Sequence, residues 1–469
     1  MFPNHRIHVH NFATNKKEKY MEIRQFEDKN LAHYSYAILS KGEIALIDPA
    51  RNPQPYYDFA EENNAKITTI IETHPHADFV SSHLEIHKST GAPIYVSELL
   101  GAEYPHQTFD NGEIIHVGQV TLKALNMPGH SPDSISIVLA DEDGKDYAVF
   151  SGDTLFIGDC GRPDLREQAG NITMKRNELA VKMYHSLRDK FIPLADEVLL
   201  YPAHGAGSLC GKGISQQNSS NMGAEKMSNW CLQDLTENEF VEHLLADQPF
   251  VPKYFPYEVA LNKKGAENFA ESISKVEKIK AEKIDPVSLD ASLAIIDSRY
   301  EQDFKKGHLK NAINLMGDIS FETWLGSLIA PGEKFYLVAE NETVLNQLIG
   351  RIAKIGYESQ IKLGIAGGIG DIITPNFDSA ELKGNEDAFT IVDIRNPSET
   401  KDRNIFDNSI NIPLYELRER ANEIPLNKPI IVHCEKGFRS AAGSSIIKSK
   451  VDGKALVYDL GDAAQNFMK

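Results

Sequence analysis

The chain has 469 residues, of which 41% are hydrophobic and 25% are charged. This globular composition argues against a disordered or fibrous protein, and the length predicts about two to four domains. Acidic residues outnumber basic ones by 67 to 49, which gives a net charge of −18. Such a charge disfavours binding to nucleic acid or to an anionic membrane surface.

Residues 1–20 are predicted to form an N-terminal tail, because they lack the apolar segment of a signal peptide or an anchor. No apolar run approaches the ~20 residues that cross a bilayer. The four cysteines are too few and too scattered for a disulfide framework: Cys160, Cys210, Cys231 and Cys434. We therefore expect a cytoplasmic protein without a membrane partner.

Short apolar runs alternate with turns from about Met21 to Pro202, which predicts a sheet-rich α/β domain. The runs are YSYAILS, IALIDP, KITTIIET, APIYVS, VTLKALN, ISIVLA, YAVFSGD and EVLLYPAHG. A helical pattern follows over Met222–Val241. The proline-rich segment after it predicts a domain boundary near residue 260.

Histidines and aspartates directly follow several of these predicted strands, where α/β sheets usually build their sites. They form the ordered set HxHxD, GHS, GDT and PAHG, which contains His74, His76, Asp78, His130, Asp153 and His204. A single member would be read as a hydrogen-bonded loop histidine or a capping aspartate. Together, neutral imidazoles and a carboxylate are the ligands that borderline divalent metals favour. The set therefore predicts a metal site.

This ordered set resembles the metallo-β-lactamase fold, a four-layer αββα sandwich with a metal at the sheet ends. Dinuclear zinc hydrolases of that superfamily, such as glyoxalase II, carry a histidine directly after the aspartate of HxHxD. Here that position is Phe79, which cannot ligate a metal, so one metal ion per chain is expected.

The segments GDCGRPD and YPAHG resemble the persulfide dioxygenase branch of the superfamily. That resemblance implies one Fe²⁺ held by His74, His130 and Asp153, with open positions for O2 and substrate. It makes His76, Asp78 and His204 residues that orient the ligands. Direct ligation of Zn²⁺ by His76 and His204 remains an alternative.

Two further residues near these motifs are candidates for substrate binding. Arg162 follows the Asp153 strand closely and suits a carboxylate clamp, although a surface salt bridge is an equal alternative. Cys210 follows His204 and suits thiol chemistry over the pocket, although most isolated cysteines are small buried hydrophobes.

The last ~210 residues contain a weak internal repeat, which predicts two tandem α/β units. Each copy has a strand that runs into Asp-x-Arg, at Asp297 and at Asp393, and a second strand about forty residues later. A boundary near Pro375 separates the copies. The predicted domains are therefore 21–260, 261–374 and 375–469.

The second strand of the last copy leads into Cys434 and then a loop that ends at Arg439. The intervening residues and the first helical residue after the arginine are Glu435, Lys436, Gly437, Phe438 and Ser440. Such a loop surrounds the sulfur with backbone N–H groups and a helix N-terminus, which favours a thiolate or a persulfide. An inert buried cysteine is the alternative.

The CxxGxR loop resembles the active loop of rhodanese sulfurtransferases, with Cys434 and Arg439 as its catalytic residues. In the middle copy Glu340 occupies the position of Cys434, which predicts a catalytically silent rhodanese-like domain.

Together the segments resemble persulfide dioxygenase–rhodanese fusion proteins of sulfide detoxification. The implied activity oxidises a low-molecular-weight thiol persulfide with O2 to sulfite and forms thiosulfate through Cys434. The alternative is a zinc-dependent, glyoxalase II-like thioester hydrolase with a fused sulfurtransferase. The sequence leaves open which thiol carries the persulfide and whether the chain forms a homo-oligomer.

Overall fold

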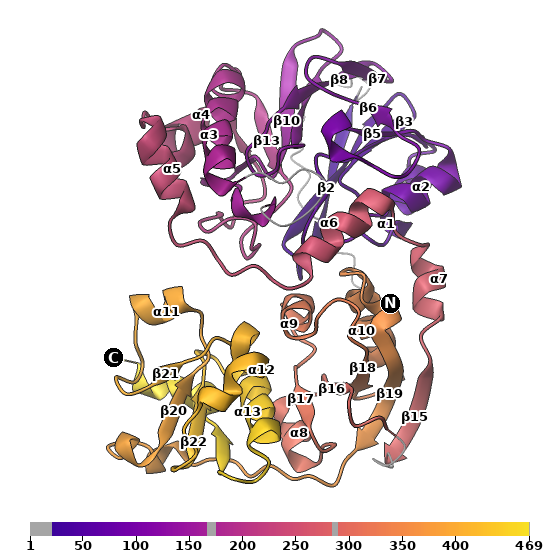
Figure 1. The fold of residues 1–469 in the computed structure, drawn as a ribbon. Coiled ribbons are helices and arrows are strands. Elements are labelled where there is room, and N and C mark those ends of the chain that lie inside the picture. The colour runs from indigo at the N-terminus through magenta and orange to yellow at the C-terminus, as the bar shows by residue number, and fades with distance from the viewer. Residues whose placement is uncertain (1–20, 167–174, 284–288, 469) are drawn as a thin grey trace, which may run out of the picture.

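The computed structural model describes residues 21–166, 175–283 and 289–468 (Figure 1). The predicted N-terminal tail lies outside this part of the chain. Two six-stranded sheets come first, followed by a five-stranded and a four-stranded sheet. We call residues 22–264 the sandwich unit, residues 278–369 the middle unit, and residues 390–468 the last unit. The sandwich unit is the upper half of Figure 1, and the other two lie beneath it.

The first sheet of the sandwich unit has the order β1-β2-β3-β4-β5-β6. Its strands are Glu22–Asp28, His33–Ser40, Glu43–Ile47, Lys66–Ile71, Ile94–Val96 and Gln107–Thr108. The second sheet has the order β14-β13-β10-β9-β8-β7. In chain order its strands are β7 Ile114–Val117, β8 Val120–Asn126, β9 Ile135–Ala140, β10 Asp146–Gly152, β13 Leu199–Pro202 and β14 Ser220–Asn221. A small pair, β11 (Leu155–Phe156) and β12 (Asp159–Cys160), follows β10.

Alternating apolar residues hold the two sheets face to face. Tyr36 and Ile38 of β2 share one buried cluster with Leu122 of β8 and Ile137 of β9. The outer faces carry helices: α1 (Gln54–Glu62) and α2 (His83–Thr90) on the first sheet, and α3 (Arg176–Ser186) and α5 (Glu237–Leu245) on the second. The expected four-layer αββα sandwich is confirmed.

The segment Met222–Val241 was predicted as one helical stretch, but the structure divides it between two helices. The chain forms α4 (Met222–Ser228), a short turn, and then α5. Asn229 ends α4 because its side chain accepts a hydrogen bond from the backbone N–H of Cys231, which starts a separate turn. Thr236 and Glu239 then form a capping box, so that α5 begins afresh.

The segment around the expected boundary near residue 260 forms helix α6 (Phe255–Lys264), with Pro256 in its first turn. This helix belongs with the sandwich, because the Asn262 side chain reaches the HxHxD loop. Its amide donates to the carbonyls of His76 and Phe79, both at 2.8 Å, and its carbonyl oxygen accepts from Ser81 N at 2.8 Å. A short helix, α7 (Phe269–Ser274), leads on to the middle unit.

The two smaller sheets are parallel and share a four-strand order. The middle sheet runs β15-β19-β18-β16-β17. The last sheet, written from its opposite edge, runs β23-β22-β20-β21, which matches the middle sheet without its edge strand β15. The middle strands are β15 Lys278–Lys283, β16 Ala294–Asp297, β17 Ala312–Asn314, β18 Phe335–Ala339 and β19 Ile361–Ile369; its helices are α8 Glu301–Lys306, α9 Phe321–Leu328 and α10 Glu342–Ala353. The last unit has β20 Thr390–Asp393, β21 Ile410–Asn411, β22 Ile430–His433 and β23 Val457–Asp459, with α11 Pro397–Asp402, α12 Leu417–Arg420 and α13 Phe438–Val451.

The Asp-x-Arg motifs also have the same structure in both units. Arg299 donates hydrogen bonds from two nitrogens to the Asp297 carboxylate and a further one to the carbonyl of Gly307. Arg395 grips Asp393 in the same way and donates to the carbonyl of Arg403, again eight residues later. The weak sequence repeat therefore corresponds to a repeated local structure.

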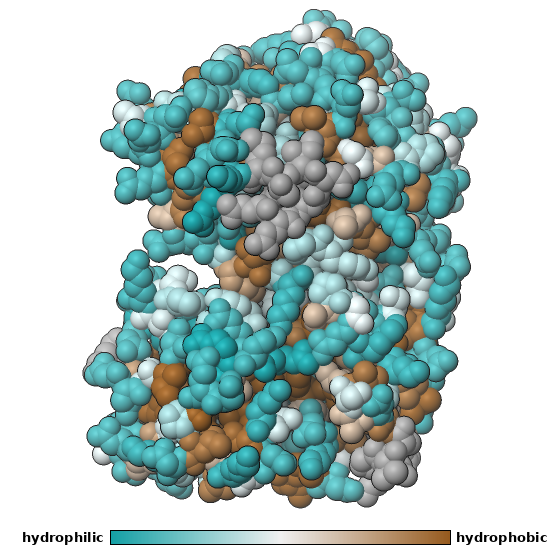
Figure 2. Space-filling model, in the orientation of Figure 1, coloured by the Kyte–Doolittle hydropathy of each residue, from teal (hydrophilic) through white to brown (hydrophobic). Residues whose placement is uncertain are grey.

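The three units meet around one continuous apolar cluster that includes Phe79, Tyr254, Trp324 and Cys434. Figure 2 shows a largely polar face, indented on its left side between the upper and lower halves. Within the described ranges, no helix has the length and apolarity needed to span a bilayer.

Candidate metal centre

The six predicted metal-site residues come together at one edge of the sandwich. The HxHxD residues follow β4, His130 lies between β8 and β9, Asp153 directly follows β10, and His204 follows β13. All six residues are buried, with an exposed fraction of 5% or less: His74, His76, Asp78, His130, Asp153 and His204. Motifs that are separated in the sequence therefore form a single buried cluster.

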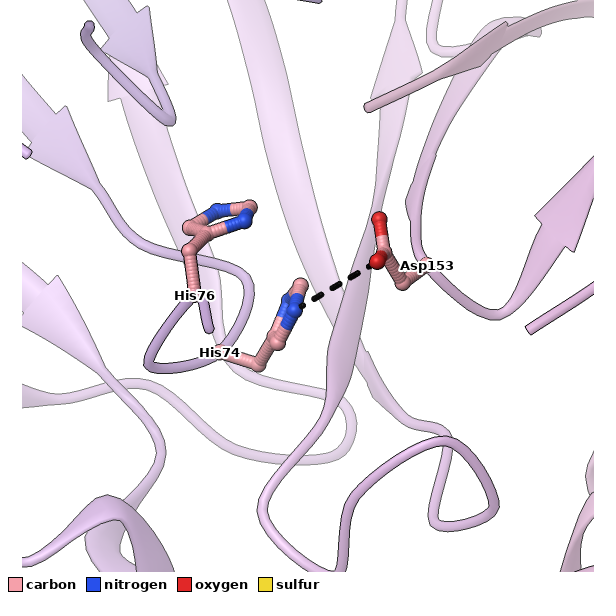
Figure 3. A group of neighbouring side chains, drawn as sticks. All are labelled: His74, His76 and Asp153. Carbon is pink, nitrogen blue, oxygen red and sulfur yellow. Dashed lines mark ion pairs between the residues drawn. The ribbon is translucent and has the colours of Figure 1, made fainter. Parts of the chain in front are cut away.

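Asp153 lies at the centre of this cluster. Its Oδ2 is 3.8 Å from Nε2 of His74 and 3.6 Å from Nε2 of His130. Its Oδ1 is 3.4 Å from Nε2 of His204. Figure 3 shows the His74 ring directed at the Asp153 carboxylate. These separations suit a shared ion, because ligands ~2.1 Å from one metal lie about 3–4 Å from each other.

The chemistry of this cluster fits a divalent cation. Neither carboxylate oxygen of Asp153 has a hydrogen-bond partner of standard geometry among the described residues. Burial raises the pKa of Asp153 to about 6, although the neighbouring His204 and His76 oppose the rise. A buried carboxylate is costly without a compensating charge, and a bound metal ion would supply that charge.

The residue before His74 fixes the orientation of its ring. The Thr73 hydroxyl donates to Oδ2 of Asp48 at 2.9 Å and lies 3.0 Å from Nδ1 of His74. Because its single proton goes to Asp48, the hydroxyl accepts from Nδ1–H of His74. The lone pair of His74 is then on Nε2, the nitrogen that faces Asp153.

His76 has a different principal partner. Its Nε2 lies 3.1 Å from Oδ1 of Asp48. Burial disfavours the charged imidazole, but the Asp48 carboxylate more than offsets this and raises the pKa of His76 to about 9. His76 also has a nitrogen within 4.8 Å of ligand atoms of His74 and Asp153. His76 therefore borders the cluster while pairing with Asp48.

Asp78 and His204 form a second contact at the same edge. Nδ1 of His204 lies 3.4 Å from Oδ2 of Asp78, and both residues group with His76 within 4.8 Å. Oδ1 of Asp78 is buried without a hydrogen-bond partner in the described part of the chain. These three side chains surround the position that a second metal would take.

Phe79 fills the position next to this group, where a dinuclear enzyme has a histidine. Its ring centroid lies 4.4 Å from that of His76 and 3.7 Å from that of His33. Sequence reasoning missed His33, which begins β2 and forms a bridge with His204. Burial, with His204 and His76 nearby, holds the pKa of His33 well below its usual value. The signal that was available is its place at a strand end.

Phe79→His should create a second metal site, because it adds an imidazole beside His76, Asp78 and His204. We expect zinc content after reconstitution to rise from about one towards two ions per chain. Metal analysis after gel filtration measures this rise. Phe79→Leu is the matched control, since it removes the ring without adding a donor. Unchanged zinc in Phe79→His would show that the missing imidazole is not what prevents a second site.

Arg162 forms a salt bridge, the second of the two alternatives that the sequence left open, although this salt bridge is buried and not at the surface. Its residue is 1% exposed, and its Nε and Nη2 both bind Asp164 at 2.7 Å. Nη1 donates to the carbonyl of Leu209 at 3.1 Å. The guanidinium thus links its own segment to the loop after His204, because it binds both Asp164 and the carbonyl of Leu209.

Cys210 lies beside the cluster, with its sulfur within 4.8 Å of ligand atoms of His130 and Asp153. Burial raises the pKa of its thiol well above the usual value, and Asp78 and Asp153 raise it further. Gly161 packs closely against the same site, since a Cβ there would lie 1.9 Å from the Asp153 carbonyl oxygen and 3.0 Å from Nδ1 of His130. The structure therefore places a neutral thiol next to the candidate metal site.

The CxxGxR loop lies in the last unit, between β22 and α13. Cys434 is 1% exposed, and Gly437 has a φ of +88°, which a glycine adopts readily. The Arg439 guanidinium binds both oxygens of Glu399, at 2.6 and 2.7 Å. The expected cation beside the sulfur is therefore already paired with a carboxylate. The strand that precedes Glu340 is β18, the counterpart of β22 in the repeat.

Known proteins reproduce this architecture. The model of the metallo-beta-lactamase superfamily matches residues 29–204, and that of the rhodanese-like domain matches residues 378–464. A solved metallo-beta-lactamase from Staphylococcus aureus subsp. aureus COL is 30% identical, with a TM-score of 0.67 over 74% of this chain and 100% of that one. The chain belongs to the metallo-beta-lactamase superfamily. The predicted fusion of this domain to a C-terminal rhodanese-like domain is confirmed.

Curated relatives of this superfamily member fall into two functional groups. The mitochondrial persulfide dioxygenase ETHE1 of Bos taurus is 28% identical over 203 residues, which are 42% of this chain and 74% of that protein. The cytoplasmic hydroxyacylglutathione hydrolase of Arabidopsis thaliana is 33% identical over 134 residues, 28% of this chain and 52% of that protein. The chain thus resembles both persulfide dioxygenases and hydroxyacylglutathione hydrolases.

Proposed function

We propose that the protein oxidises a low-molecular-weight thiol persulfide with O2 to sulfite at one iron ion, and that Cys434 then forms thiosulfate. The observation that carries this proposal is the buried cluster of His74, His130 and Asp153 beside Phe79, in one chain with a rhodanese-like loop. The similarity to persulfide dioxygenases supports the same reaction.

His74, His130 and Asp153 would hold the iron. When bound, Fe²⁺ in such a site offers open coordination positions for O2 and for the substrate sulfur. Thr73 and Asp48 keep the His74 lone pair directed at the site, and Asn262 of α6 fastens the loop that carries His74 and His76. The overall reaction is RSSH + O2 + H2O → RSH + H2SO3, in which O2 takes four electrons from the outer sulfur.

Cys434 would carry the second reaction. Its thiolate takes the outer sulfur of another persulfide and releases that thiol. Sulfite attacks the sulfur on Cys434, which forms thiosulfate and restores the thiolate. The backbone N–H groups of the loop and the start of α13 stabilise the anionic sulfur. Glu340 cannot form a persulfide, so the middle unit is proposed to be a catalytically silent rhodanese-like domain.

A zinc-dependent thioester hydrolase is the second candidate, because hydroxyacylglutathione hydrolases are also relatives. Reconstitution with each metal separates the two functions. The iron-loaded protein should consume O2 with cysteine persulfide, and the zinc-loaded protein should not. Neither form should hydrolyse S-lactoylglutathione efficiently. Efficient hydrolysis by the zinc form, without persulfide-dependent O2 uptake by the iron form, would replace the proposal with the hydrolase.

A further inference from the structure

A cavity of about 140 Å³ lies where the three units meet. The sandwich unit contributes Leu31, Asp78 and Ser208 to its lining, and α9 of the middle unit contributes Thr323 and Trp324. Asn396, directly before α11, brings the last unit to the same cavity. Loops and helices of all three units therefore shape one space.

This cavity borders the candidate metal centre at Asp78, which lines the cavity and contacts His204. One oxygen of Asp78 lies 3.4 Å from Nδ1 of His204, whose other ring nitrogen is 3.4 Å from Asp153. The other oxygen of Asp78 is buried and lacks a hydrogen-bond partner among the residues described. A polar group inside the cavity is the partner that would satisfy it.

Trp324 forms the opposite wall. Its indole stacks on Phe250, with the ring centroids 5.5 Å apart, and the Arg439 guanidinium carbon lies 5.9 Å from its ring centroid. The residue is 9% exposed, so both faces of the ring are largely covered by protein. Helix α9 packs closely against the start of α6: a Cβ at Gly326 would lie 2.2 Å from the Tyr254 ring.

We propose that this cavity binds the thiol portion of the persulfide while its outer sulfur reaches the metal, and that the middle unit is thereby a substrate-binding domain. This inference rests on the proposed function. It gives the unit that lacks the cysteine a role in the reaction of the sandwich unit.

The lining also defines the chemical class of the thiol. Its volume is below the ~300–1,000 Å³ of pockets for drug-sized ligands. Of the described residues that line it, Asp78 alone is charged, and none is lysine or arginine. A thiol with several phosphates would meet a carboxylate without a cation to balance it. The cavity therefore suits a cysteine-sized thiol that carries an amine or amide, and it disfavours coenzyme A.

Steady-state O2 uptake by the iron-loaded full-length protein tests this assignment. Trp324→Ala should raise KM for cysteine persulfide by about tenfold, the usual cost of losing a central aromatic contact, with little change in kcat. Ile319→Ala is the matched control, because it removes an apolar side chain 61% exposed on the same unit. Coenzyme A persulfide should have a kcat/KM at least about tenfold below that of cysteine persulfide. An unchanged KM in Trp324→Ala, or equal use of both persulfides, would overturn the proposal.

A binding measurement keeps the cavity testable even if Trp324→Ala does not fold or no persulfide is oxidised. The chain has two tryptophans, so Trp230→Phe leaves Trp324 as the sole indole. Titration of this variant with S-methylcysteine should change the Trp324 emission in a saturable way. A flat titration would show that the cavity does not bind a small thiol. A saturable titration without O2 uptake would support the binding site in the cavity and contradict the proposed oxidation.

Discussion

Cys434→Ser should convert a protein that produces thiosulfate into one that releases sulfite. A serine hydroxyl is not ionised at neutral pH and cannot hold sulfane sulfur, so the transfer step stops. The candidate metal centre lies in another unit with its own ligands, so persulfide-dependent O2 uptake should continue at the wild-type rate. Chromatographic analysis of sulfite and thiosulfate, with parallel O2 measurement, records both effects.

Glu340→Ala is the control for this product switch. Glu340 is an exposed residue at the corresponding position of the middle unit, so its removal should leave the ratio of sulfite to thiosulfate unchanged. Thiosulfate formation by Cys434→Ser at the wild-type rate, above the spontaneous reaction, would disprove the role of Cys434. Cys210, beside the metal cluster, would then be the next thiol to replace.

His130→Ala should abolish iron binding at micromolar metal concentrations. Replacing residues that only orient metal ligands typically lowers affinity about 10–100-fold, so loss of a direct ligand should cost more than about 100-fold. The structure adds a reason: without His130, the buried Asp153 loses one of three imidazoles that face its oxygens. Iron content after anaerobic reconstitution and gel filtration measures the effect, and O2 uptake should fall with it.

His76→Ala distinguishes a ligand from an orienting residue in the same cluster. Because Nε2 of His76 faces Asp48, we expect a weaker effect, within the ~10–100-fold range of orienting residues. Equal loss of iron in both variants would make His76 a direct ligand. Retention of iron by His130→Ala would remove His130 from the ligand set.

The sequence predicted the members of the candidate site better than their partnerships. The motifs follow predicted strands, and the ends of these strands lie at one edge of the sandwich. The position of the motifs was therefore enough to predict that the six residues belong to one site. It could not show that Asp48 pairs with His76, since Asp48 lies in no recognisable motif. His33 was missed although it stands directly before the predicted strand YSYAILS. The sequence also did not show which carboxylates the two arginines bind: Asp164 binds Arg162, and Glu399 binds Arg439.

The fold was predictable where periodicity is strong and less so where side chains interrupt it. The alternating runs predicted β2, β8 and β9, and the Asp-x-Arg repeat predicted the strands β16 and β20, which end at the aspartates of that motif. The break between α4 and α5 depends on the Asn229 side chain and on the capping box at Thr236. The cavity between the units depends on how their surfaces meet, for which no local pattern exists.

The most direct test of the account is the stoichiometry of O2 in the iron-loaded Cys434→Ser protein supplied with cysteine persulfide. With the transfer step removed, the proposed oxidation predicts one O2 consumed for each sulfite released, at about one iron per chain. No O2 consumption by protein that holds its iron would contradict the central claim.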